Sequence, residues 1–108
     1  GKAKSEKPVE EITALIDKQL EDDSDWIKFE SAFNELDFEF IANLNKRHQG
    51  LTRQEGRLLV YIRLNLSNKE ISELLNIGLK SVEMKRYRVR KKLGLEKSQN
   101  LSEYIHSF

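Results

Sequence analysis

The chain has 108 residues, enough for one modest hydrophobic core and too few for two large domains. Hydrophobic residues make up 38% and charged residues 34%, a balance typical of a folded, charge-rich helical protein. The absence of cysteine excludes disulfides, thiolate metal sites and cysteine nucleophiles, and no apolar run approaches the ~18 residues of a membrane span. We therefore expect a cytoplasmic protein without membrane contact.

The net charge of +1 hides an uneven distribution along the chain. Residues 1–50 hold 7 Lys and Arg against 12 Asp and Glu, a net of −5, whereas residues 51–108 hold 12 against 6, a net of +6. Between positions 80 and 92, seven basic residues accompany a single acid, Glu83. Such a stripe is expected of a surface that meets phosphates. The acidic half is either an ordinary charged surface or a cover for the basic face that a partner releases.

The N-terminal part of the chain is predicted to be helical after a short tail. Residues 1–7 are expected to be a charged tail outside the fold or a cloning remnant, and Gly1 in place of Met suggests a piece of a longer chain. From residue 8 to about 21 the apolar residues fall on one helical face. Ser24 or Asp25 is predicted to cap a second helix, and a third is predicted from about residue 37 to 46. The aromatic residues of the second helix, predicted to be core, are Trp26, Phe29 and Phe33.

Four further helices are predicted at about residues 52–64, 67–75, 80–93 and 100–108. Three of them begin with the pattern of a capping box, in which a side-chain oxygen accepts an amide proton and an acid three residues later reaches back. The pairs are Thr52 with Glu55, Ser67 with Glu70, and Asn100 with Glu103. No alternating pattern of a strand competes. The predicted fold is therefore all-α, with the N-terminal helices (residues 8–50) packed on a C-terminal four-helix domain (residues 51–108).

The connection between the second and third of these helices has the pattern of a helix-turn-helix. It reads Asn76-Ile77-Gly78-Leu79, in which we expect the glycine to permit the turn and the apolar pair to fill the angle between helices. In the helix that follows, about 100° per residue places Val82, Val89 and Leu93 toward the core. The opposite face then presents Lys80, Met84, Tyr87, Arg88 and Lys91, flanked by Glu83 on one side and by Lys85 and Lys92 on the other.

Four segments in this order resemble the LuxR-type (GerE-like) DNA-binding domain. They are Leu51-Thr52-Arg53-Gln54-Glu55, Leu66-Ser67-Asn68-Lys69-Glu70-Ile71, Lys80-Ser81-Val82 and Lys91-Lys92-Leu93-Gly94-Leu95. The resemblance implies a bacterial transcription regulator whose helix from Lys80 enters the major groove of double-stranded DNA. It also implies a homodimer on DNA, supported by the last helix. The aromatic-rich N-terminal half resembles the segment that precedes such domains in large sensor-regulators, so an upstream sensor domain and RNA polymerase are expected partners.

The resemblance, carried over by position, also identifies candidate contacts. The candidates for reading base edges are Glu83, Met84 and Tyr87. Glu83 can accept from a cytosine amine, whereas Met84 or Tyr87 can touch a thymine methyl group. The candidates for phosphate contacts are Lys80, Ser81, Lys85, Arg86, Arg88 and Lys91. Lys85 stands where a histidine is frequent in the family and Glu83 where a basic or polar residue is, so sequence preference does not transfer.

Two other classes of function compete with DNA binding. One is a helical protein-interaction adaptor of the transcription machinery, in which the basic face is merely solvated. An enzyme is a distant third, because the sequence shows no paired acids in an apolar setting, no phosphate-binding glycine loop and no metal cluster. His48 and His106 lack a second ligand at metal spacing and are interpreted as solvated or capping residues. No metal or cofactor is expected.

Overall fold

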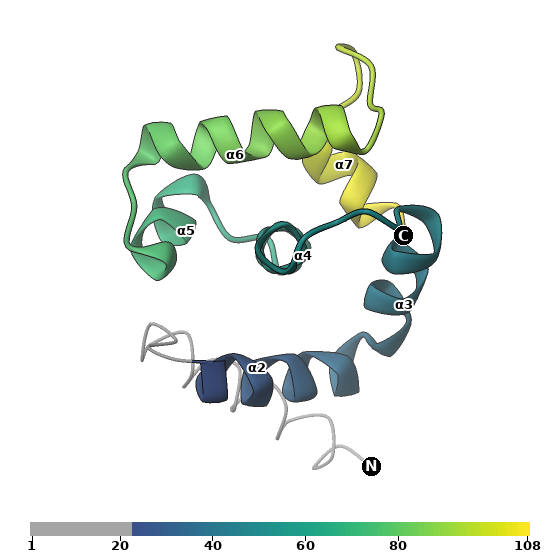
Figure 1. Cartoon of the computed structure of the whole chain (residues 1–108), viewed down its shortest axis with the longest axis vertical. Helices are drawn as coiled ribbons and strands as arrows, with labels where there is room; N and C mark the ends of the chain where they lie inside the picture. Colours follow the sequence, from purple (N-terminus) through teal and green to yellow (C-terminus); the bar gives the residue numbers. More distant parts are fainter. Residues whose placement is uncertain (1–22) are drawn as a thin grey trace. The chain divides into compact units, whose positions relative to one another are not determined.

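The computed structural model describes residues 23–108; the predicted tail at 1–7 and the predicted helix at 8–21 lie outside the described residues. Regular structure within residues 23–108 is entirely helical, which confirms the all-α prediction. The helices, shown in Figure 1, are α2 (Asp23–Leu36), α3 (Phe38–Arg47), α4 (Arg53–Arg63), α5 (Asn68–Leu75), α6 (Leu79–Lys92) and α7 (Leu101–His106). None of these described helices is long and apolar enough to span a lipid bilayer.

The chain divides into two compact units, and the boundary falls between Ala42 and Asn43, inside α3. The last turn of α3 belongs with the second unit, where the ring nitrogen Nε2 of His48 lies 2.7 Å from the Tyr104 hydroxyl of α7. The division at residue 50 that the sequence suggests stays a prediction about separate domains. So does the packing of the N-terminal helices on the C-terminal domain.

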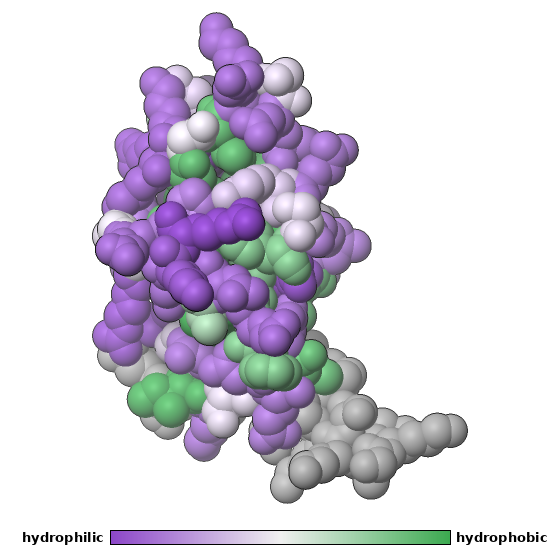
Figure 2. Space-filling model, turned by 90° about the vertical axis from the view of Figure 1, so that its right-hand side faces the viewer, coloured by the Kyte–Doolittle hydropathy of each residue, from purple (hydrophilic) through white to green (hydrophobic). Residues whose placement is uncertain are grey.

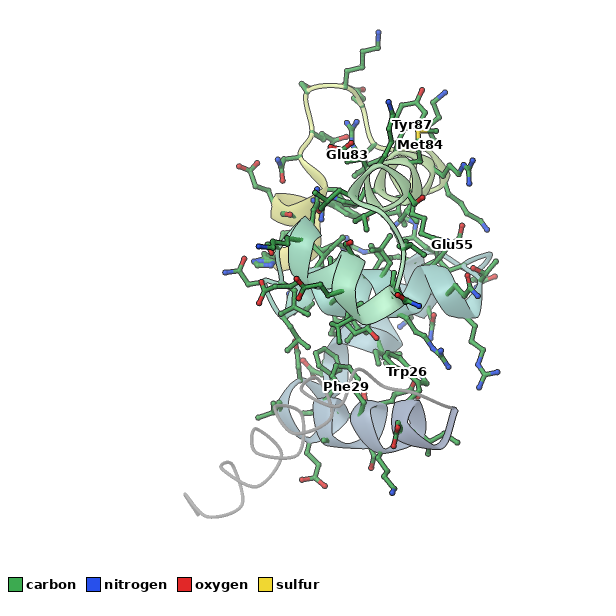
Figure 3. The ribbon with its side chains drawn as sticks, turned by 90° about the vertical axis from the view of Figure 1, so that its left-hand side faces the viewer. Trp26, Phe29, Glu55, Glu83, Met84 and Tyr87 are labelled. Carbon is green, nitrogen blue, oxygen red and sulfur yellow. The ribbon has the colours of Figure 1, made fainter. Side chains whose placement is uncertain are left out.

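The first unit has an aromatic core, as predicted. Trp26 and Phe29 project from the same face of α2 (Figure 3), and their rings stack with centroids 5.1 Å apart. Phe33 of α2 meets Phe40 of α3 edge to face at 6.0 Å. All four side chains are buried. The predicted cap at Ser24 or Asp25 is wrong, because both residues lie inside α2; cap-forming residues are tolerated within a helix that packing stabilises.

The second unit is built around α4. Its five consecutive residues Leu58–Ile62 are buried, and since neighbouring helical residues point to different sides, this helix is covered all round. Figure 1 views α4 end-on while α6 runs across the picture, so the two helices cross steeply. The other buried apolar side chains of α5, α6 and α7 and their flanks are Ile71, Val82, Val89, Leu93, Leu101 and Ile105. The predicted core face of α6 is confirmed.

The predicted helix starts of the second unit are largely confirmed. Thr52 and Ser67 each form a complete capping box, in which the side-chain oxygen accepts from the amide three residues on and the glutamate returns a bond. At α7 only half of the predicted box forms within the described residues: Asn100 accepts from the Glu103 amide at 3.0 Å, without a return bond from the carboxylate.

Three helix ends share one motif that the sequence interpretation missed. Asn65, Asn76 and Gly94 follow α4, α5 and α6, each with a positive φ (66°, 55° and 75°). After each, the next amide bonds a carbonyl five residues back, as in Leu95 N to Arg90 O at 3.1 Å. This is the Schellman geometry, which satisfies the last carbonyls of a helix.

The turn between α5 and α6 therefore works differently from the prediction. Asn76 supplies the left-handed conformation, whereas Gly78 has φ −74° and ψ 161°, extended values that any residue adopts. Gly78 is the N-cap of α6 without a side chain to bond the helix amides, and a Cβ there would meet nothing within 4 Å. The expectation that glycine permits this turn is wrong.

On the face that Figure 2 shows, hydrophilic residues predominate and hydrophobic ones lie in small separate groups between them. This surface accords with the 34% of charged residues in the sequence. No single large apolar patch dominates the described residues on this face.

Candidate nucleic-acid interface

The outward face of α6 carries the base-edge candidates. Glu83, Met84 and Tyr87 are all exposed, and Figure 3 shows Met84 and Tyr87 on the side of α6 turned away from α4 and α5. Lys80 and Ser81 are exposed in the first turn of the same helix. The sequence-based face assignment therefore agrees with the side chains that the structure leaves accessible.

Arg86 does not share this face. Its half-buried guanidinium donates to the Ser102 hydroxyl of α7 at 3.1 Å, and burial lowers its pKa, although arginine stays charged. This predicted phosphate contact is therefore turned toward α7, because its position on α6 lies close to the core-facing Val82 and Val89. The placement favours a structural role for Arg86.

Arg90 holds the loop between α6 and α7. One guanidinium nitrogen donates to the carbonyl oxygens of Glu96 at 2.7 Å and Gln99 at 2.9 Å, with a longer contact to Lys97 at 3.4 Å. Carbonyl oxygens that a helix ladder does not use need such donors. Arg90 is thus engaged inside the protein.

Lys92 is also engaged, by α4. Its ammonium lies 2.8 Å from Oε1 of Glu55, the capping-box glutamate. Partial burial raises the pKa of Glu55, but the hydrogen bonds from Lys92 and Thr52 outweigh it and hold this pKa below its usual value. The ion pair connects the end of α6 to the start of α4.

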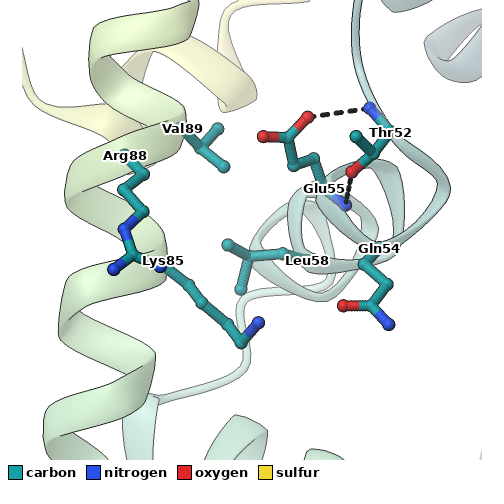
Figure 4. A pocket seen from close by; sticks show the side chains of 7 residues that line it. All are labelled: Thr52, Gln54, Glu55, Leu58, Lys85, Arg88 and Val89. Atoms are coloured by element: carbon teal, nitrogen blue, oxygen red, sulfur yellow. Dashed lines mark hydrogen bonds between the residues drawn. The ribbon is translucent and has the colours of Figure 1, made fainter.

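An open pocket separates the start of α4 from the middle of α6 (Figure 4). Lys85 and Arg88 line its α6 side, while the dashed bonds of the Thr52–Glu55 capping box mark its α4 side. The remaining lining residues are Gln54, Leu58 and Val89. Lys85 is half-buried and Arg88 exposed. Two cations at the rim of a solvent-open hollow attract an anion such as a phosphate group.

The seven cations of α6 thus fall into two groups. Arg86, Arg90 and Lys92 bond other parts of the protein. The other four, the uncommitted cations, are Lys80, Lys85, Arg88 and Lys91; no hydrogen bond or ion pair engages them within the described part of the chain. Lys91 stacks its ammonium over the Tyr87 ring, 4.9 Å from the centroid. Within the described residues, the outward face of α6 therefore offers positive charge without a protein partner around the candidates for base contacts.

In a comparison with known families, residues 49–105, just over half of the chain, match the GerE family of bacterial regulatory proteins (luxR family). The chain belongs to the luxR family of bacterial regulatory proteins. The resemblance read from the four sequence segments is confirmed. The family is one of DNA-binding transcription regulators and not of enzymes. No curated protein and no solved structure matched the chain.

The last helix of the luxR-family domain is locked to α4 at its end. Arg63 donates to the carbonyl oxygen of Ile105 at 2.8 Å, and the His106 ring bonds the carbonyl oxygen of Ile62 at 2.9 Å. His106 thus caps the last turn of α4, one of the two roles expected of it. Leu101 and Ile105 are buried in the core of the second unit. The surface that α7 leaves for a partner is therefore mainly polar.

Two features of this luxR-family domain differ from the sequence interpretation. The expectation that Leu79 helps to fill the angle between the helices is wrong, because Leu79 is exposed at the first residue of α6. Arg90 looked like one more cation of the stripe. A helical wheel places Arg90 near the core side and so carried some signal, but its carbonyl partners lie in an irregular loop. In the described residues, no group of three His, Asp or Glu is arranged to hold a metal ion.

Proposed function

We propose that residues 51–108 are the DNA-binding output module of a bacterial transcription regulator and that α6 lies in the major groove. The observation that carries this proposal is the sorting of the α6 cations. Arg86, Arg90 and Lys92 bond other parts of the protein, whereas the uncommitted cations surround the exposed Glu83, Met84 and Tyr87. Charge left without a protein partner on one helical face is costly unless an anion meets it.

The roles follow from chemistry and position. Phosphates are contacted by Lys80 and Ser81 at the helix start, by Lys85 and Arg88 at the pocket, and by Lys91. These contacts displace counterions from the DNA, which supplies most of the non-specific affinity. Ser81 donates from its hydroxyl. Base edges are read by Glu83, Met84 and Tyr87. Arg86 is removed from the phosphate contacts in this proposal.

We further propose that two copies bind DNA together. A good base contact contributes about 1 to 3 kcal/mol, so the few readers of one small domain discriminate poorly alone. Two-fold pairing through α7 would set the spacing of two half-sites. Because Leu101 and Ile105 are used in the core, this pairing relies on the polar outer side of α7 and is weak without DNA. A sensor domain upstream and RNA polymerase complete the proposed assembly.

The test begins with selection of bound sites from random duplexes, using the full chain. Affinity for the enriched duplex is then measured over a range of salt concentrations for the wild type and for the triple variant Lys80→Ala, Arg88→Ala, Lys91→Ala. We expect weaker binding and a salt slope flattened by roughly 2 to 3 units, since each lost phosphate contact removes about 0.9.

The matched control is Lys28→Ala, an exposed lysine of α2 in the first unit, which should leave the slope unchanged. An unchanged slope in the triple variant would contradict the proposal. The adaptor would be favoured instead by two results together. The wild type would select no duplex, and the triple variant would still bind a protein of the transcription machinery.

A further inference from the structure

The exposed large hydrophobic side chains of residues 43–108 all belong to one helix. They are Leu79, Met84 and Tyr87 of α6, with 51%, 44% and 49% of their surface exposed. Single exposed apolar residues are ordinary on protein surfaces, but here they gather on the helix that also carries the uncommitted cations. An apolar group among cations needs a target that is itself apolar.

The charges around these side chains locate that target. Lys80 and Lys91 are placed to meet phosphates, whereas phosphates repel the carboxylate of Glu83. Neither Leu79 nor Met84 can donate a hydrogen bond to a phosphate oxygen. The strip formed by Leu79, Glu83, Met84 and Tyr87 is therefore suited to the base edges between the two phosphate backbones rather than to the backbones themselves.

The major groove offers one apolar feature. Guanine, adenine and cytosine show hydrogen-bond donors and acceptors there, and thymine adds the C5-methyl group to its O4 acceptor. We propose that α6 reads its DNA site largely through thymine methyl groups, with Leu79, Met84 and Tyr87 as the residues that contact them. This inference rests on the proposed function, and it adds Leu79 to the base-reading residues.

The local geometry supports each of the three contacts. Leu79 opens α6, and the N-terminal residues of a groove-bound helix are those that reach base edges. Met84 is unbranched and adapts to an uneven surface. The Lys91 ammonium, 4.9 Å from the Tyr87 ring centroid, occupies one side of that ring and restrains it. A restrained ring loses less conformational entropy when it contacts a methyl group.

Replacing thymine by deoxyuridine removes the methyl group and keeps every hydrogen-bonding atom and every phosphate. The probe is the duplex enriched from the random library with the full chain, synthesised with deoxyuridine at one thymine at a time. We expect affinity to fall about fourfold at each contacted thymine, the equivalent of ~0.8 kcal/mol for burying one methyl group. The salt slope should not change, since no phosphate contact is lost.

Variants assign each methyl group to a side chain. Leu79→Ala and Met84→Ala, both at exposed positions that leave the core intact, should weaken binding of the thymine duplex and each abolish the deoxyuridine effect at a different position. Phe38→Ala, which removes an even more exposed apolar side chain from the first unit, is the matched control and should keep the full effect at every position.

Equal affinity for the thymine and deoxyuridine duplexes, with a steep salt slope and a selected sequence still present, would overturn the methyl reading and leave the proposed function standing. A deoxyuridine effect that persists undiminished in both variants would also overturn it. If no sequence is selected and the affinity for DNA does not depend on salt, both the methyl reading and the proposed function are overturned.

Discussion

Lys92 and the amide of Thr52 bond the same carboxylate oxygen, Oε1 of Glu55, at 2.8 and 2.7 Å. One side chain thus closes the capping box of α4 and fixes the last turn of α6. This contact helps to orient α6, because Lys92 lies at the end of α6 and Glu55 in the first turn of α4. A residue that looks like a plain helix cap in the sequence therefore also positions the helix that we propose to bind DNA.

Glu55→Gln should make the free energy of unfolding less dependent on pH in the acidic range. The pKa of Glu55 is lowered on folding, so its contribution is present above its usual value of 4.5 and is lost as the pH falls through the lower folded value. In urea unfolding, the variant should be less stable than the wild type at pH 7 by up to about 1 kcal/mol, as for partly exposed ion pairs. That difference should shrink as the pH drops below 4.5.

Glu73→Gln, at an exposed position of α5, serves as the matched control for the loss of one carboxylate. A deficit of Glu55→Gln that stays constant from pH 7 to pH 3 would show that the charge of Glu55 does not matter.

The turn between α5 and α6 gives a second prediction. Gly78→Ser should raise stability by roughly 0.5 to 1 kcal/mol, because it adds a capping hydroxyl at an extended position with free space and restricts the unfolded chain. Asn76→Ala should lower the stability by about 1 kcal/mol, since the left-handed conformation is less favourable for alanine than for asparagine. Thermal unfolding of both variants checks this. Destabilisation by Gly78→Ser would instead show that the turn requires glycine at position 78.

Local patterns were predictable from the sequence, and long-range contacts were not. The capping boxes at Thr52 and Ser67 and the core face of α6 depend on neighbouring residues, so helical geometry alone foretells them. The helix ends at Asn65, Asn76 and Gly94 carry a local signal of the same kind, which the sequence interpretation did not use. At each, a Leu is followed by Asn or Gly and then by an aliphatic residue.

The roles of the arginines required the tertiary structure. Arg86 and Arg88 are two residues apart in one basic stretch, and composition treats them alike. Their fates differ because Arg86 points to Ser102 of α7, whose distance from α6 is set by an irregular loop. The sequence could place a cation on a helical wheel, but it could not say which neighbouring element would supply a partner.

This difference is measurable. Arg88→Ala should flatten the salt slope of DNA binding by about 0.9, the effect of one phosphate contact. Arg86→Ala should leave the slope unchanged and lower the free energy of unfolding, because it removes the bond to Ser102 from a half-buried site. Ser102→Ala tests the same bond from the other side. A flattened slope in Arg86→Ala would restore Arg86 to the phosphate contacts.

The burial of the α7 side chains predicts the oligomeric state. With Leu101 and Ile105 in the core, the chain should sediment as a monomer at micromolar concentration and bind a two-half-site duplex as two copies. Analytical ultracentrifugation with and without the duplex distinguishes these states. A stable dimer in the absence of DNA would contradict the prediction and point to an interface outside the polar face of α7.

In the proposed complex, α6 is the element that enters the major groove. An NMR titration of the ¹⁵N-labelled full chain with the enriched duplex tests it most directly, because it reports on every backbone amide at once. We predict that the largest shifts and the strongest salt-sensitive broadening occur between Leu79 and Lys91. Shifts concentrated in α2 or α3, with the amides of α6 unmoved, would show that α6 does not enter the groove.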